Sequence, residues 1–185
     1  MSTTKIAVIV GSIRKDSMNR RLALALAGLA PQEFSFRHVR IDDLPNFNQD
    51  LEQEPGEAVK RFKGEINASR GLLFVSPEYN RSMPGLLKNA IDQGSRPYGQ
   101  SVWAGKPAGV IGISPGAIGT ALAQQHLRNV LAYLDVPTLG QPEAFLQNKE
   151  GLLDDKGNIG VEATQKFLKS WMDKYIAFVK QHTKD

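Results

Sequence analysis

Cysteine is absent from the sequence, which excludes disulfide bonds, thiolate zinc sites and cysteine nucleophiles. The three histidines, His38, His126 and His182, lie far apart and form no metal-ligand motif. The first apolar run, residues 6–10, is too short for a signal sequence or a membrane span. These absences predict a water-soluble cytoplasmic protein that contacts no membrane and needs neither metal nor disulfides to fold.

Two common glycine-rich nucleotide loops are missing as well. The dinucleotide fingerprint G-x-G-x-x-G needs three glycines, whereas the turn after the first apolar run contains only Gly11. No segment matches the P-loop pattern G-x-x-x-x-G-K-[ST]. A pyrophosphate site of the Rossmann type and a P-loop NTPase are therefore disfavoured.

Charge of one sign is not concentrated anywhere in the chain. The 23 lysines and arginines against 19 acidic residues give a net charge of +4, and the basic residues are spread along the sequence. Nucleic acid is therefore not an expected partner. A mildly positive field would still attract anionic cofactors and substrates.

What the chain does contain is a regular alternation of apolar runs and helical patterns, which is typical of a parallel sheet covered on both faces. Predicted strands are residues 6–10, 34–41, 72–75, 108–113 and a short one within 139–146 that Pro142 interrupts. The clearest helical period is in the last helix, where one face carries Leu168, Trp171, Met172, Tyr175, Ile176 and Val179. Together these elements predict a single α/β domain over residues 1–185.

The turn from the first strand to the first helix, residues 11–19, has the composition of a phosphate site. Gly11 allows close approach, and the helix start offers free N–H groups and the positive end of the dipole. Ser12, Ser17 and Asn19 add short polar groups, and Arg14 adds a planar guanidinium. The alternative is ordinary helix capping. A cradle rich in side chains suits a terminal monophosphate, such as that of flavin mononucleotide (FMN).

Two further polar turns follow the third and fourth predicted strands, at residues 76–85 and 114–119. In an open sheet, ligands bind at the carboxyl ends of the strands, beside the switch point. We therefore predict a flavodoxin-like three-layer sandwich with a five-stranded parallel sheet of order 2-1-3-4-5 and helices on both faces. In that order the first two turns converge on one crevice, and Gly116 and Gly119 suggest close ligand approach in the third.

These motifs together resemble the NADPH-dependent FMN reductases, and among them the bacterial quinone and chromate reductases. The resemblance covers nearly the whole chain and is carried by Gly11-Ser12-Ile13-Arg14 with Ser17 and Asn19, by Pro77-Glu78-Tyr79-Asn80 with Ser82, Pro84 and Gly85, and by Lys88-Asn89-Ala90-Ile91-Asp92. It implies that the FMN phosphate is held by Ser12, Arg14, Ser17 and Asn19. It also implies that the flavin ring contacts Pro77, Glu78, Tyr79 and Asn80, with Ser114 and Gly116 on its other side.

The resemblance further implies a homodimer or homotetramer, with Arg128 and Glu143 at positions associated with assembly. The alternative for Arg128 and Glu143 is an ordinary surface pair, which contributes only about 0 to 1 kcal/mol. Tyr79 likewise has an alternative, as a loop aromatic that packs on the next subunit.

The expected activity is hydride transfer from NADPH to bound FMN, with NADH as the alternative donor. Electrons then pass to a small acceptor by a ping-pong mechanism, and the acceptors considered are quinones, free flavin, azo compounds and chromate. No catalytic side chain is required, since the cofactor carries the chemistry. Backbone N–H groups around Glu78 to Asn80 are expected to stabilise the reduced ring, and Glu78 itself to orient the loop.

Two other functions remain as alternatives. One is an FMN-binding electron carrier or redox-sensing module without reductase activity. The other is an esterase, because Gly112-Ile113-Ser114-Pro115-Gly116 matches the G-x-S-x-G nucleophile elbow. Pro115 argues against an esterase, since the residue after the nucleophile should donate its N–H to the oxyanion and proline has none.

Overall fold

Five parallel strands form the centre of the computed structural model, which describes residues 3–183. Their order is β2-β1-β3-β4-β5, and this confirms the predicted flavodoxin-like topology. The strands are β1 (Thr4–Val10), β2 (Phe34–His38), β3 (Gly71–Val75), β4 (Ala108–Ser114) and β5 (Phe145–Gln147).

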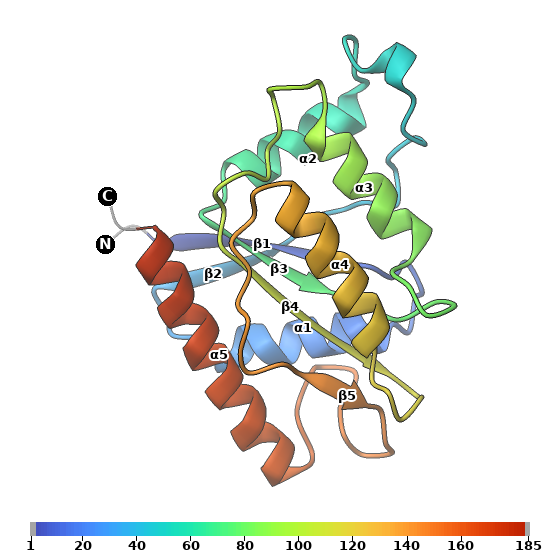
Figure 1. Ribbon diagram of the computed structural model, residues 1–185. Coiled ribbons are helices and arrows are strands. Elements are labelled where there is room, and N and C mark those ends of the chain that lie inside the picture. Colours follow the sequence, from blue (N-terminus) through green and yellow to red (C-terminus); the bar gives the residue numbers. More distant parts are fainter. Residues whose placement is uncertain (1–2, 184–185) are drawn as a thin grey trace.

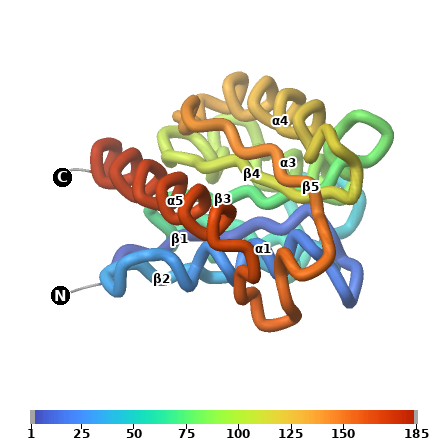
Figure 2. Tube along the Cα trace, turned by 90° about the horizontal axis from the view of Figure 1, so that it is seen from below, coloured from blue at the N-terminus to red at the C-terminus, as the bar shows by residue number. Residues whose placement is uncertain are grey.

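Helices cover both faces of this sheet, as Figures 1 and 2 show. On one face lie α1 (Met18–Leu29) and α5 (Glu162–His182). On the other lie α2 (Glu57–Asn67), α3 (Gly85–Ser95) and α4 (Ala121–Tyr133). A short 3₁₀ helix, η1 (Gln49–Leu51), interrupts the loop between β2 and α2.

The central strands are apolar throughout because both of their faces are buried. In β1, Val8 packs in the core under α1 and α5, while its neighbour Ile9 packs in the core under α2, α3 and α4. The same alternation in β3 places Leu73 in the first core and Phe74 in the second. A strand buried on both faces has no polar side, which is why its sequence does not alternate.

The last helix confirms its predicted buried face, since all six periodic residues from Leu168 to Val179 are buried. The Trp171 ring stacks on Tyr175 at 5.7 Å between centroids. The Tyr175 hydroxyl donates a hydrogen bond to the Leu72 carbonyl at 2.7 Å, and burial raises the pKa of this phenol. Gly109 of β4 makes room for both rings, because a Cβ there would lie within 2.9 Å of each.

Two predicted strands end or begin elsewhere. The strand predicted over residues 34–41 ends at His38, and Val39 N–H donates the last bond to β1 before the chain turns. The fifth strand begins only at Phe145, after Pro142. A proline cannot donate to a ladder, so the preceding residues run beside β4 with a single isolated bridge from Thr138 to Ala108.

Candidate functional site

The turn after β1 is packed tightly against the turn after β3. Gly11 N–H donates to the Val75 carbonyl at 2.9 Å. A Cβ at Gly11 would lie 2.9 Å from Ser76 Oγ and 3.2 Å from a methyl of Leu87. The glycine is therefore required for contact between the two turns, and it brings the first two candidate segments together at one edge of the sheet.

Free backbone N–H groups line the first turn. Those of residues 12, 13 and 15–19 donate to no partner within residues 3–183. Ser17 is the N-cap of α1, and its Oγ accepts from Arg20 N–H at 3.3 Å. The N–H groups of residues 17–19 lie at the positive end of the α1 dipole, a combination that favours the binding of an anion.

The polar side chains of the first turn differ in burial and in hydrogen bonding. Ser12 and Ser17 are buried, with 8% and 4% of their surface exposed. Ser12 Oγ accepts weakly from Arg14 N–H at 3.4 Å, and the exposed Arg14 guanidinium has no partner within the described residues. The turn therefore offers hydroxyls, an unpaired guanidinium and N–H donors, the groups that suit a phosphate monoester.

The side chain of Asn19, in the first turn of α1, makes its hydrogen bonds to β4. Its Nδ2 donates to the Ile113 carbonyl at 2.9 Å, and its Oδ1 accepts from Ile113 N–H at 3.1 Å. The side chain is only 2% exposed. The observed role of Asn19 is to fasten α1 to β4, where it satisfies two backbone groups beyond the end of β3. Direct phosphate binding by Asn19 stays a prediction.

The turn after β3 is a tight hairpin. Tyr79 and Ser82 exchange two backbone hydrogen bonds, of 2.9 and 3.0 Å. Between them Asn80 and Arg81 have φ angles of 52° and 64°, the left-handed pair of a type I′ turn. Tyr79 N–H is thus committed within the hairpin, whereas those of Glu78 and Asn80 donate to no partner within residues 3–183. The Tyr79 side chain is 49% exposed at the rim.

Glu78 joins this hairpin to the helix after the third turn. Its Oε2 accepts from Leu122 N–H at 3.0 Å and from Ala123 N–H at 3.1 Å, at the start of α4. The carboxylate therefore caps the positive end of that helix. Arg81 lies 3.7 Å from the other oxygen. Glu78 orients the loop as expected, and it does so by tying the second turn to the third.

The third turn is held by close backbone packing. A Cβ at Gly112 would overlap the Ser76 carbonyl and Thr120 Oγ1. Gly119, with φ of 61°, lies so near the Phe145 backbone that a Cβ would come within 2.6 Å of it. The close approach expected of Gly119 is thus to β5 rather than to a ligand. A Cβ at Gly116 would meet only Ser114 Oγ, at an ordinary contact distance of 3.8 Å.

Ser114 and its neighbours do not form a hydrolase site. Ser114 Oγ donates to the Gly116 carbonyl at 3.3 Å. His182 is near the end of α5, where its Nδ1 contacts the Phe178 carbonyl at 2.9 Å. His126 instead contacts Ser82 Oγ at 3.0 Å. Without a histidine partner or an N–H at Pro115, the G-x-S-x-G match has no catalytic geometry.

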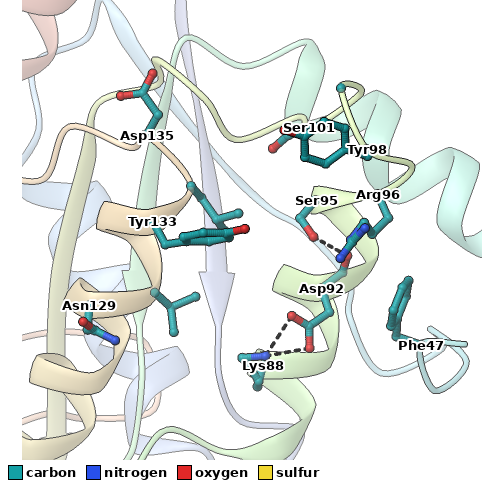
Figure 3. Close-up of a pocket in the computed structure, with 13 residues that line it drawn as sticks. Phe47, Lys88, Asp92, Ser95, Arg96, Tyr98, Ser101, Asn129, Tyr133 and Asp135 are labelled. Atoms are coloured by element: carbon teal, nitrogen blue, oxygen red, sulfur yellow. Dashed lines mark hydrogen bonds and ion pairs between the residues drawn. The ribbon is translucent and has the colours of Figure 1, made fainter. Parts of the chain in front are cut away.

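A hollow of about 940 Å³ lies between α3 and α4 (Figure 3). Lys88 and Asp92 pair on successive turns of α3 at 2.8 Å, and Tyr133 projects from α4. Tyr98 and Arg96 belong to the loop that closes the other side. None of the residues predicted to contact FMN lines this hollow.

Residues 3–183 contain neither a membrane-spanning helix nor a cluster of metal ligands. No helix there combines the length and the apolarity needed to cross a membrane. In the same residues, no three His, Asp or Glu side chains are grouped so that they could hold a metal ion.

The sheet order and the free N–H groups after β1 are typical of flavodoxin-like nucleotide-binding proteins. Residues 4–151 match the family model described as NADPH-dependent FMN reductase. The chain belongs to this family. It is therefore a flavin-dependent oxidoreductase with FMN as cofactor and NAD(P)H as co-substrate.

Individual relatives are similar over nearly their whole length. A 2-hydroxy-1,4-benzoquinone reductase of a Burkholderia species is 56% identical over 95% of this chain and 96% of its own. An NAD(P)H-dependent FMN reductase of Pseudomonas aeruginosa is 40% identical over 91% and 95%. The solved structure of FerB, a flavoenzyme NAD(P)H:(acceptor) oxidoreductase from Paracoccus denitrificans, has a TM-score of 0.93 with 44% identity over 97% and 99%.

Proposed function

We propose that this protein is an NAD(P)H:quinone reductase whose FMN lies across the three turns, and that it works by a ping-pong cycle. The observation that carries the proposal is the row of free N–H groups at residues 12, 13 and 15–19, beside the unpaired guanidinium of Arg14. Ser12 and Ser17 complete this cradle for the FMN phosphate. Asn19 acts mainly by holding the first turn of α1 on β4.

The second and third turns form the walls for the flavin ring. Exposed apolar side chains stand on all three turns at this edge, namely Ile13, Tyr79 and Ile118. Pro77, Glu78 and Asn80 shape the second wall, with the free N–H groups of Glu78 and Asn80 available to the ring. Ser114 and Gly116 form the opposite wall. Bound FMN supplies the redox chemistry, and the chain supplies position and electrostatics.

The nature of the acceptor is drawn from the relatives. Proteins from Burkholderia and Pseudomonas putida with 56% and 51% identity are named as reductases of quinones. We extend this acceptor class to the present chain, and with it free flavin, azo compounds and chromate, since no side chain described here selects one acceptor. A cytoplasmic location is part of the same proposal.

We also propose that the chain acts as a homodimer or homotetramer, with Arg128 and Glu143 in the interface. One guanidinium nitrogen of Arg128 donates to the Leu139 carbonyl at 2.7 Å, but its buried Nε has no partner within the described residues. Burial lowers the pKa of Arg128, and the field of Glu143 opposes this shift. Arg128 is half-buried and Glu143 is exposed in the single chain, so both side chains have surface left for a neighbouring subunit.

The test is the visible spectrum of the purified protein after FMN is added and unbound FMN is removed. Retained flavin should bleach with NADPH under anaerobic conditions and recover its colour when a quinone is added. Retained flavin that never bleaches would instead favour the electron carrier or redox sensor. Loss of all flavin on desalting would contradict both the reductase and the electron carrier or sensor.

A further inference from the structure

A small pocket of about 130 Å³ lies beside the first turn, on the side of β2. Two of its lining residues, Ser12 and Ile13, also belong to the proposed FMN site, and the other lining residues do not. The polar lining consists of Ser12, Arg20, His38, Arg40 and Asp42, and Ile13 closes the rim.

Positive charge in this pocket exceeds negative charge. Asp42 is already paired, since its Oδ1 lies 3.0 Å from Arg40 Nε. Arg40 also approaches Asp43 at 3.5 Å. The side chain of Arg20 has no partner within residues 3–183, so its guanidinium is available to a ligand. Its position is fixed by the first turn of α1, where Arg20 N–H is bound by the Ser17 cap.

His38 adds a donor to the same pocket. It pairs in register with Val8, whose side chain packs under α1, so the imidazole faces the helix that carries Arg20. Burial and the charge of Arg20 lower the pKa of His38, against the opposing fields of Asp42 and of Glu65 on α2. In either protonation state the imidazole offers at least one N–H donor.

We propose that this pocket binds the 2′-phosphate of NADPH, through Arg20, His38 and Arg40, and so sets the preference for NADPH over NADH. The inference rests on the proposed function. A guanidinium without a partner matches the added dianion that distinguishes the two cofactors. A single phosphate group fits a volume of this size, whereas a nucleoside does not.

The location suits a dinucleotide that reaches the flavin. The ring walls lie at the ends of β3 and β4, and the pocket lies between the ends of β1 and β2. These two places are two strand spacings apart, about 10 Å. NADPH with its nicotinamide at the ring walls can span that distance.

The experiment measures equilibrium binding of 2′,5′-ADP, 5′-AMP and inorganic phosphate to the FMN-loaded protein by calorimetry. The variants are Arg20→Ala, Arg20→Lys and the matched control Arg37→Ala. Arg37 is an exposed arginine of the same strand as His38, and it pairs in register with Ala7, on the opposite face of the sheet. Thermal unfolding of each variant checks that it is folded.

We expect 2′,5′-ADP to bind at least tenfold more tightly than 5′-AMP. Arg20→Ala should reduce this ratio to below threefold, Arg20→Lys should retain part of it, and Arg37→Ala should leave it unchanged. NADPH oxidation should follow the same pattern in kcat/KM, with NADH values within twofold of the wild type.

Three results would overturn the assignment. Equal affinity for 2′,5′-ADP and 5′-AMP would remove the 2′-phosphate site, whether or not the protein oxidises NADPH. Tight inorganic phosphate displaced equally by both nucleotides would indicate a site for free phosphate. Loss of FMN in Arg20→Ala with an unchanged ratio would assign the pocket to the flavin. If NADPH turnover is absent but the ratio is as expected, the proposed function fails and the pocket assignment stands.

Discussion

The first turn and the pair formed by the second and third turns are built in different ways. In the first turn, the residues that hold the turn in place, Gly11 and Asn19, are separate from Arg14 and the free N–H groups that are offered to a ligand. The second and third turns are instead cross-linked to each other. Glu78 reaches α4, and the Ser76 carbonyl packs on Gly112.

This difference separates binding from folding. An anion cradle uses backbone donors left free by the helix start, so a side chain can be removed there without disturbing the turn. Walls for a planar ring need two segments held at a fixed separation, and that separation depends on contacts between the segments. Substitution of Arg14 in the first turn should therefore alter ligand affinity, and substitution of Gly112 or Glu78, which join the second and third turns, should alter stability.

The strongest test of the cross-linked region is Gly112→Ala. The added methyl group would overlap the Ser76 carbonyl and Thr120 Oγ1, both on rigid backbone or buried side chains. We expect a loss of about 3 kcal/mol or more in the free energy of unfolding, seen as a fall in Tm of roughly 6 to 12 °C for a chain of this length. Gly116→Ala is the control, and it should stay within about 0.5 kcal/mol. Equal Tm values for the two variants would contradict the described packing.

The first turn gives the next largest effect, on affinity. Arg14→Ala should remove a charge-assisted phosphate contact of roughly 1.5 to 3 kcal/mol, which corresponds to FMN binding about 10 to 150 times weaker. Unfolding of the flavin-free protein should change by less than about 0.5 kcal/mol. Arg37→Ala, at an exposed arginine away from the turn, serves as the control. Unchanged FMN affinity in Arg14→Ala would refute the phosphate assignment.

Substitutions at Glu78 test whether the link between the second and third turns depends on the negative charge or only on a hydrogen-bond acceptor. Glu78→Ala leaves two N–H groups of α4 without their cap and should lower stability by about 1 to 2 kcal/mol. Glu78→Gln keeps an acceptor and loses only the interaction with the helix dipole, about 0.3 to 1 kcal/mol. Chemical denaturation of both variants measures the difference. If Gln is as destabilising as Ala, the charge and not the hydrogen bonds holds the two turns together.

Ser114→Ala should have the smallest effect. The only side-chain bond described for Ser114 is a 3.3 Å contact within its own turn. We expect NADPH–quinone activity to stay within about an order of magnitude, because the cofactor carries the chemistry and no covalent step involves this serine. Abolished activity with flavin still bound would revive a catalytic serine.

The sequence predicted the fold well because the relevant signals are local. Uninterrupted apolar runs identified β1, β3 and β4, and the period of α5 matched all six buried positions. The roles of Asn19 and Glu78 were less accessible, since their partners lie 94 and 44 residues away. Gly112 carried a usable signal, because a glycine within a strand often marks close backbone approach.

The two hydrogen bonds between the Asn19 side chain and the Ile113 backbone also couple hydrogen exchange in β4 to the conformation of the first turn. The Asn19 side-chain amide makes the two hydrogen bonds that a neighbouring strand would make with Ile113. The Ile113 N–H should therefore resist exchange with solvent deuterium although it lies past the end of β3. Opening of the first turn of α1 breaks that protection. The exchange rate of this one amide would therefore record how often the phosphate cradle comes apart in solution.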